Sequence, residues 1–146
     1  MKSRARILIA EAVPDIRELF RIILDPVTDC IDFAGDNQEA LAKIGMACYD
    51  LVFLDVGVPE LDGLECAEIL NQRHPVLPVV VSCSIKLPTR LAAHFLSHPT
   101  NFLVRKPFDI KEMREIVLHV CQRSVLRARR RSMSPRRHAD TLAEAV

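Results

Sequence analysis

Four short apolar runs in this 146-residue chain are each followed closely by polar residues that could do chemistry together. Glu11 follows the first run, Asp55 the second, three small hydroxyl or thiol residues the third, and Lys106 the fourth. Carboxylates suit Mg²⁺, whereas hydroxyl groups and a lysine suit the oxygens of a phosphate. The residue types therefore predict a site where a metal ion and a phosphoryl group meet. The runs cover residues 7–10, 51–54, 79–81 and 102–104, and the three small residues are Ser82, Cys83 and Ser84.

Each of these residues, taken singly, is more often an ordinary polar loop residue that water surrounds. Their shared position at the end of an apolar run favours a common site. The sheet that would bring them together is predicted by the alternation of apolar runs with segments of helical period. The predicted strands cover residues 7–10, 30–34, 51–54, 79–81 and 102–104, and the predicted helices cover residues 15–24, 37–44, 63–70 and 89–96, with a last helix from residue 109.

Apolar spacing also predicts which helix positions face the core. Pro14 suits the first turn of the first helix, and Thr89 is a plausible cap for the fourth. The expected core positions are Ile16, Leu19, Phe20 and Ile23 in the first helix and Ile110, Met113, Val117 and Cys121 in the last.

Five apolar strands that alternate with five helices predict an α/β fold with a parallel sheet covered on both faces. We expect a flavodoxin-like, doubly wound (βα)5 domain with a five-stranded sheet in the order 2-1-3-4-5. In such sheets the ligand site lies beyond the carboxyl ends of the strands, where the polar residues fall. Another kind of doubly wound domain is the alternative that the pattern leaves open.

Two segments carry a resemblance to a known family. Residues 50–65 resemble the acceptor segment of CheY-like receiver domains of two-component response regulators, in which an aspartate ends the third strand and a Pro-x-x-Asp-Gly loop follows. Residues 106–109 resemble the Lys-Pro-Phe turn before the last helix of that family, and residues 7–19 resemble its first strand and helix. The resemblance covers about residues 4–121.

The resemblance implies a role for each residue of the predicted site. Asp55 would accept a phosphoryl group from a histidine kinase or phosphotransfer protein, as the nucleophile of a phosphorelay signalling switch. Mg²⁺ would neutralise charge on the transferring group. The implied Mg²⁺ ligands are Glu11, Asp55 and the backbone carbonyl of Gly57; the implied phosphate-binding or switch residues are Lys106 and one of Cys83, Ser82 and Ser84; and the implied structural residues are Pro59, Gly63 and Pro107, the last after a candidate cis peptide bond.

The switch position is ambiguous. Counting from Pro78 places Cys83 there, and a thiol is a weak donor. Counting back from Lys106 places Ser84 there instead, and Ser82 also stays open.

Two further positions depart from the family pattern. Ala12 stands where the family has a second acid, which would weaken Mg²⁺ binding, and Asp15 is better explained as an acid at a helix start. Leu103 stands where the family has a switch aromatic.

The sequence therefore leaves two functions open: a single-domain response regulator that accepts a phosphoryl group, and a pseudo-receiver that acts as a phosphorylation-independent protein-interaction module. In either case we expect a signalling protein and not an enzyme.

Charge divides the chain into an acidic body and a basic tail. Residues 123–146 hold seven arginines against two acids, whereas the preceding residues hold 13 basic and 17 acidic residues. We expect a receiver domain over residues 1–126 and a basic, disordered tail over residues 127–146, with weak non-specific polyanion contact as a second reading of the tail. No apolar run is long enough for a membrane helix, and the five cysteines lack metal-ligand spacing. We therefore expect a cytoplasmic protein without membrane contact. We also expect a downstream protein partner, which the sequence does not name.

Overall fold

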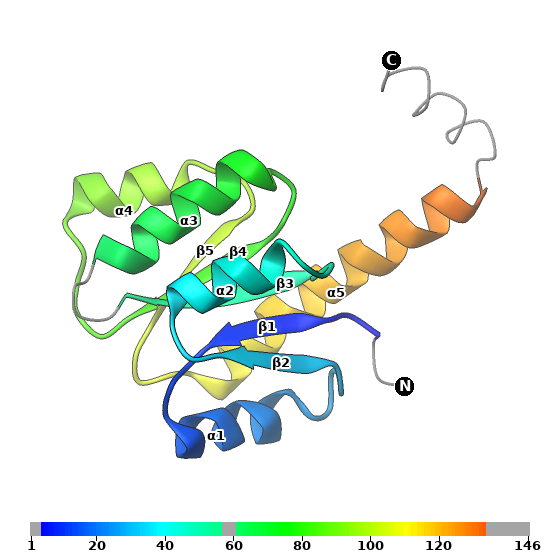
Figure 1. The fold of residues 1–146 in the computed structure, drawn as a ribbon, viewed down its shortest axis with the longest axis horizontal. Helices are drawn as coiled ribbons and strands as arrows, with labels where there is room; N and C mark the ends of the chain where they lie inside the picture. Colours follow the sequence, from blue (N-terminus) through cyan, green and yellow to red (C-terminus); the bar gives the residue numbers. More distant parts are fainter. Residues whose placement is uncertain (1–3, 57–60, 134–146) are drawn as a thin grey trace.

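The structure, a computed structural model, describes residues 4–56 and 61–133, in which strands and helices alternate along the chain (Figure 1). Two residues of the predicted site, Gly57 and Pro59, lie outside the described residues. The strands are β1 (Ile7–Ala10), β2 (Ile31–Ala34), β3 (Leu51–Val56), β4 (Val79–Cys83) and β5 (Asn101–Arg105). The helices are α1 (Pro14–Leu24), α2 (Asn37–Ile44), α3 (Leu61–Arg73), α4 (Thr89–Leu96) and α5 (Ile110–Met133).

The five strands form one parallel sheet in the order β2-β1-β3-β4-β5, which confirms the predicted fold. Because all strands are parallel, their carboxyl ends lie at one edge of the sheet. The register places Asp55 of β3 beside Ser82 of β4 at that edge. The predicted site residues that follow the strands are thereby gathered on one side of the molecule.

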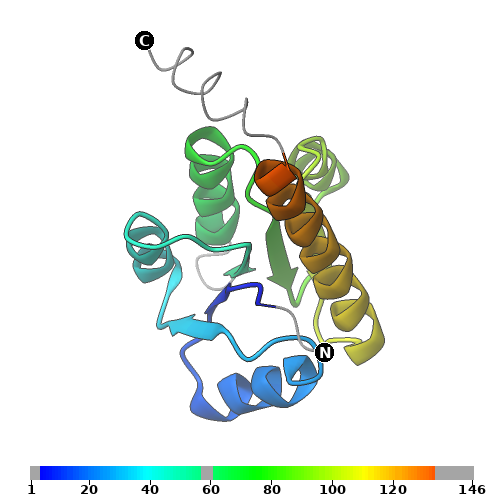
Figure 2. The ribbon, with the colours of Figure 1, turned by 90° about the vertical axis from the view of Figure 1, so that its right-hand side faces the viewer.

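Alternation along the strands sends side chains to two separate cores. Leu51 and Phe53 of β3 pack with α1 and α5, whereas Val52 and Leu54 pack with α2, α3 and α4. Figures 1 and 2 show these two sets of helices on opposite faces of the sheet. A sheet covered on both faces explains why its strands are continuous apolar runs.

Helix α1 presents a slightly different face than the sequence predicted. Ile16 is half-buried and Phe20 and Ile23 are buried as expected, but Leu19 is 44% exposed. Leu24, which was not predicted, is completely buried. The stripe of Phe20, Ile23 and Leu24 faces the sheet, and Leu19 lies at its margin. Pro14 begins the helix as predicted.

In helices α4 and α5, two residues also differ from what the sequence predicted. Thr89 is the first residue of α4 and makes no side-chain cap; Pro88 holds the cap position. In α5, Met113, Val117 and Cys121 are buried, whereas Ile110 is 47% exposed because it is the first residue of the helix, before the stripe that packs on the sheet.

The helix α5 continues to Met133 and projects past the sheet (Figures 1 and 2). Residues 127–133, which were expected to be disordered, are therefore helical, in keeping with the high helix propensity of arginine and alanine. The expected boundary at residue 126 falls inside this helix. The rest of the predicted tail, residues 134–146, lies outside the described residues.

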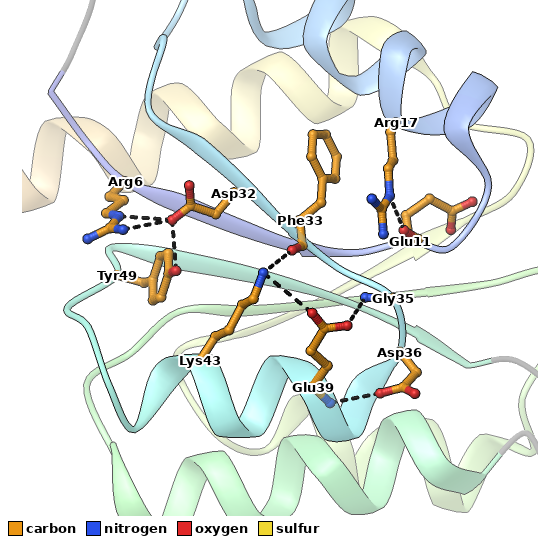
Figure 3. A network of polar contacts seen from close by, with 10 residues as sticks. All are labelled: Arg6, Glu11, Arg17, Asp32, Phe33, Gly35, Asp36, Glu39, Lys43 and Tyr49. Atoms are coloured by element: carbon orange, nitrogen blue, oxygen red, sulfur yellow. Dashed lines mark hydrogen bonds and ion pairs between the residues drawn. The ribbon is translucent and has the colours of Figure 1, made fainter.

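The edge strand β2 is fastened by side chains from its neighbours (Figure 3). The carboxylate of Asp32 accepts hydrogen bonds from Arg6 Nε at 3.0 Å and from the Tyr49 hydroxyl at 2.8 Å. The Arg6 guanidinium also lies 4.9 Å from the centre of the Tyr49 ring. Lys43 of α2 donates to the main-chain oxygen of Phe33. These contacts tie β2 to residues before β1 and β3 and to α2, and the Lys43 contact satisfies one backbone oxygen of the edge strand.

Within the described part of the chain, none of the helices combines the length and apolar character needed to cross a membrane. Three cysteines, Cys66, Cys83 and Cys121, are buried, and Cys30 and Cys48 are exposed.

Candidate functional site

The centre of the site is an ion pair between the ends of β3 and β5. Lys106 Nζ lies 2.9 Å from Asp55 Oδ1, and both side chains are about one-third exposed (31% and 32%). The main-chain nitrogen of Lys106 donates to the oxygen of Cys83 at 2.8 Å, which joins the start of the β5–α5 turn to the end of β4. The following peptide bond, Lys106–Pro107, is cis. One oxygen of the Asp55 carboxylate is thus paired with a cation.

An aromatic cluster packs against the turn that contains Lys106. The ring of Phe108 lies 5.3 Å from the ring of Phe20 in α1, and Phe20 in turn lies 5.7 Å from Phe53 in β3. Edge-to-face and tilted pairs at this distance are favourable. The β5–α5 turn is therefore packed against the face of the sheet that carries α1 and α5.

Glu11 enters the site from the end of β1. Its main-chain nitrogen donates to Ala34 at 2.8 Å, and its main-chain oxygen accepts from Arg17 Nε of α1 (Figure 3). Burial raises the pKa of the Glu11 carboxyl; Lys106 opposes this shift, and the negative charge of Asp55 adds to it. Two carboxylates therefore share the site, and the negative charge of Asp55 disfavours the ionised form of Glu11.

A cavity of about 690 Å³ opens beside Asp55. Its lining joins Asp55 and Lys106 with Glu11 and Ala12 after β1, with the first residues of α2, and with Glu65 and Cys66 of α3. A smaller, mostly apolar cavity of about 190 Å³ is also lined by Asp55 and Lys106, together with residues of α1 and of the turn between β5 and α5. The side chain of Asp55 is therefore accessible from the solvent through these cavities.

The backbone of Asp55 is held from two sides by residues of α2 and α3. Asn37 Nδ2 donates to the main-chain oxygen of Asp55 at 3.0 Å. Gly63 approaches the same group so closely that a Cβ at Gly63 would lie 2.6 Å from that oxygen. The sequence pointed to Gly63 but missed Asn37, because an asparagine at the start of a helix gives no sign of a contact 18 residues away.

The three candidates for the hydroxyl or thiol of the site differ in their surroundings. Ser82 is buried, lies beside Asp55 in the register, and lines the smaller cavity with Asp55 and Lys106. Its hydroxyl donates to the main-chain oxygen of Leu54 at 3.3 Å. Cys83 is 1% exposed and its thiol lies 3.9 Å from the main-chain oxygen of Val104, and neither Cys83 nor the exposed Ser84 lines the two cavities at Asp55.

The carboxylates fit a Mg²⁺ ion with few protein ligands. Within the described residues, no three histidine, cysteine or acidic side chains are grouped closely enough to hold a metal. Glu11 and Asp55, however, line one cavity, and the raised pKa of Glu11 reflects a burial and a repulsion that a cation would relieve. Mg²⁺ is commonly held by one or two carboxylates together with water and phosphate oxygens. These two side chains would therefore hold it, while Gly57, the third implied ligand, lies outside the described residues.

Known proteins match this chain in both sequence and fold. Residues 7–118 match the family model described as the response regulator receiver domain. The chain is 33% identical over 116 residues to the response regulator protein PilR of Pseudomonas aeruginosa, a match that covers 79% of this chain and 26% of PilR. The chain thus spans about a quarter of the length of that relative.

Two solved structures share both sequence and fold with this chain. The receiver domain of NtrX from Brucella abortus is 29% identical with a TM-score of 0.66, and the alignment covers 80% of this chain and 98% of that one. The response regulator protein TrrA from Thermotoga maritima, solved in complex with Mg²⁺-BeF, has the same identity, TM-score and coverage. The fold, the strand-end site and the family match agree, and the chain belongs to the response regulator receiver domain family.

Proposed function

We propose that this chain accepts a phosphoryl group on Asp55 from a phosphohistidine of a histidine kinase or phosphotransfer protein. The observation that carries the proposal is the partly exposed Asp55 carboxylate at the carboxyl end of β3, paired with Lys106 and sharing a cavity with Glu11. Receiver domains in general act in phosphorylation signalling, and one oxygen of this carboxylate is free of the lysine contact.

In the proposed reaction, a carboxylate oxygen of Asp55 forms a bond to phosphorus while the phosphorus–nitrogen bond of the donor breaks. The electron pair goes to the imidazole, which leaves neutral when its other nitrogen carries a proton. The Lys106 ammonium, now 2.9 Å from Asp55 Oδ1, would balance charge on the phosphoryl oxygens. Mg²⁺ bound by Glu11 and Asp55, with the Gly57 carbonyl, would supply further positive charge at that group.

Ser82 is our first choice for the hydroxyl that bonds a phosphoryl oxygen, because it lies beside Asp55 and lines a cavity with it. Cys83 and Ser84 are less favoured, since Cys83 is buried away from both cavities and Ser84 is exposed. We also propose structural roles for Gly63, Pro107 and Pro59; the close contact between Gly63 and the backbone of Asp55 supports the first of these.

A second function, protein binding without phosphorylation, is favoured by one observation. Ala12 lines the cavity beside Glu11 and Asp55 and contributes no carboxylate to it. A pocket with fewer acids would bind Mg²⁺ less tightly and react more slowly.

The two functions are separated by incubating the protein with acetyl phosphate and Mg²⁺ and measuring its intact mass. The first function predicts that the wild type gains one phosphoryl group and that Asp55→Asn gains none. Asp50→Asn is a matched control, because Asp50 precedes the opposite end of β3, and this variant should react like the wild type. A folded wild type that stays unmodified would favour the second function.

The projecting part of α5 suggests an additional contact. Residues 123–133 hold five arginines and no acid. We propose that this segment makes weak, salt-sensitive contact with polyanions, in addition to an unidentified downstream protein partner.

A further inference from the structure

The main chain of the acceptor candidate is tied to a helix that the proposed reaction does not use. Asn37, the first residue of α2, donates from its side-chain amide to the main-chain oxygen of Asp55 at 3.0 Å. Asn37 is half-buried, and it lines the same cavity as the Asp55 carboxylate. The contact joins the start of α2 to the residue that would carry the phosphoryl group.

Asn37 is itself held in place by the residues around it. Asp36 caps α2 by accepting from the main-chain nitrogen of Glu39 at 2.7 Å, and the Glu39 carboxylate accepts from the nitrogen of Gly35 at 2.6 Å (Figure 3). The main-chain oxygen of Asn37 accepts a hydrogen bond from the thiol of Cys66 in α3, with the sulfur 3.4 Å away. The start of α2 is thus fixed at both its backbone and its cap.

This arrangement restricts the rotation of the peptide group that follows Asp55. Lys106 holds one oxygen of the Asp55 side chain, and Asn37 holds the main-chain oxygen of the same residue. Two hydrogen bonds to opposite ends of one residue restrict both its side-chain and its backbone torsions. The direction of the second carboxylate oxygen, which would attack phosphorus, depends on both.

We propose that Asn37 is a positioning residue for phosphoryl transfer, which aligns Asp55 by holding its main-chain oxygen. The inference rests on the proposed acceptor role of Asp55. It differs from that role in that Asn37 touches neither the phosphoryl group nor the metal. A purely structural role for Asn37, as a residue at a helix start, would affect stability and not the rate of transfer.

Two variants of Asn37 and one control separate these roles. Asn37→Ala removes the donor. Asn37→Asp keeps the size of the side chain and suits a helix start, but it cannot donate to the carbonyl. The control is Asn71→Ala, which removes a different amide contact, the reciprocal pair of hydrogen bonds between Asn71 and Asn101 at 2.9 Å. Asn71 lies in α3 outside both cavities at Asp55.

The measured quantities are the rate constant of Asp55 phosphorylation from acetyl phosphate at saturating Mg²⁺, and the carbonyl ¹³C resonance of Asp55 in the unmodified protein. Both Asn37 variants should react more slowly by roughly tenfold, since small displacements of a reacting group cost rate in this range. Both should also shift the Asp55 carbonyl resonance upfield. Asn71→Ala should keep the wild-type rate and resonance.

The outcomes distinguish the inference from the function on which it rests. A wild type that takes no phosphoryl group would refute the acceptor role, and the positioning role with it. A wild type that reacts, together with Asn37 variants that react equally fast, would overturn the positioning role alone. An Asn71→Ala variant as slow as Asn37→Ala would also overturn it, because the loss would then follow from general destabilisation.

Discussion

Substitution of Gly63 by alanine tests how tightly α3 is packed on the acceptor strand. A Cβ at this position would lie 2.6 Å from the main-chain oxygen of Asp55, 3.0 Å from its carbonyl carbon and 3.1 Å from the nitrogen of Val56. All three atoms belong to the backbone of β3, so no side chain can move to relieve the contact. The helix and the strand must separate instead, in the part of the sheet that positions Asp55.

The size of the effect follows from the cost of overpacking. Adding a methyl group to a closely packed contact costs about 1–3 kcal/mol. For a domain of this size, 1 kcal/mol corresponds to a change of roughly 3–4 °C in melting temperature. A glycine-to-alanine change also stabilises the protein by about 0.4–1 kcal/mol through the unfolded chain, where the alanine conformation is allowed.

A second glycine provides the matched control. Gly45 is the C-cap residue of α2, with φ of −69°, and a Cβ there would lie 3.5 Å from the main-chain oxygen of Ala42, which is an ordinary contact. Gly45→Ala should therefore keep or slightly raise the melting temperature. Because both variants share the gain from the unfolded state, the difference between them isolates the clash.

Thermal unfolding by circular dichroism gives the comparison directly. We expect Gly63→Ala to melt roughly 3–12 °C below Gly45→Ala, as the overpacking cost implies. Equal melting temperatures would refute the close packing of α3 against Asp55. They would also remove the structural role that we assign to Gly63.

Three further predictions concern the pocket and the last helix. Burial raises the pKa of Glu11, so its carboxyl binds a proton more readily in the folded protein than in the unfolded chain. The stability of the wild type relative to Glu11→Gln should therefore fall as pH rises through and above the ordinary range of glutamate pKa values. A parallel pH dependence of the two proteins would contradict this. Ala12→Asp should restore a second acid beside Glu11 and increase the Mg²⁺-dependent rise in melting temperature, and an unchanged rise would mean that residue 12 does not reach the metal. Truncation after Leu126 should leave the melting temperature nearly unchanged, because Cys121 is the last residue of α5 that the structure describes as buried, and a large loss would make the projecting helix part of the core.

The sequence predicted the fold because its dominant signal is local. Runs such as residues 79–81 are apolar without alternation, which is typical of strands buried on both faces, and the helices between them fix the parallel topology. The same topology predicted that Asp55 and Lys106 would meet, although 51 residues separate them. Chain order and strand ends were sufficient for that contact.

Other features depend on distances that spacing does not encode. Asn37 reaches Asp55 because the packing of α2 on the sheet places its first residue beside the main-chain oxygen of Asp55. No sequence pattern within α2 specifies that position. Leu19 and Ile110 fit the apolar spacing of their helices, yet they lie at the margin and at the first turn of the packed surface. The choice among Ser82, Cys83 and Ser84 likewise depends on the register between β3 and β4, which counting along the chain left open.

The acceptor role of Asp55 is tested most directly by trapping the acyl phosphate at its residue. After incubation with acetyl phosphate and Mg²⁺, borohydride reduces an aspartyl phosphate to homoserine, which peptide mass spectrometry locates in the sequence. We predict homoserine at position 55 in the wild type and no reduced residue in Asp55→Asn. A folded wild type without homoserine at position 55, or reduction at Glu11 instead, would contradict the assignment of Asp55 as the phosphoryl acceptor.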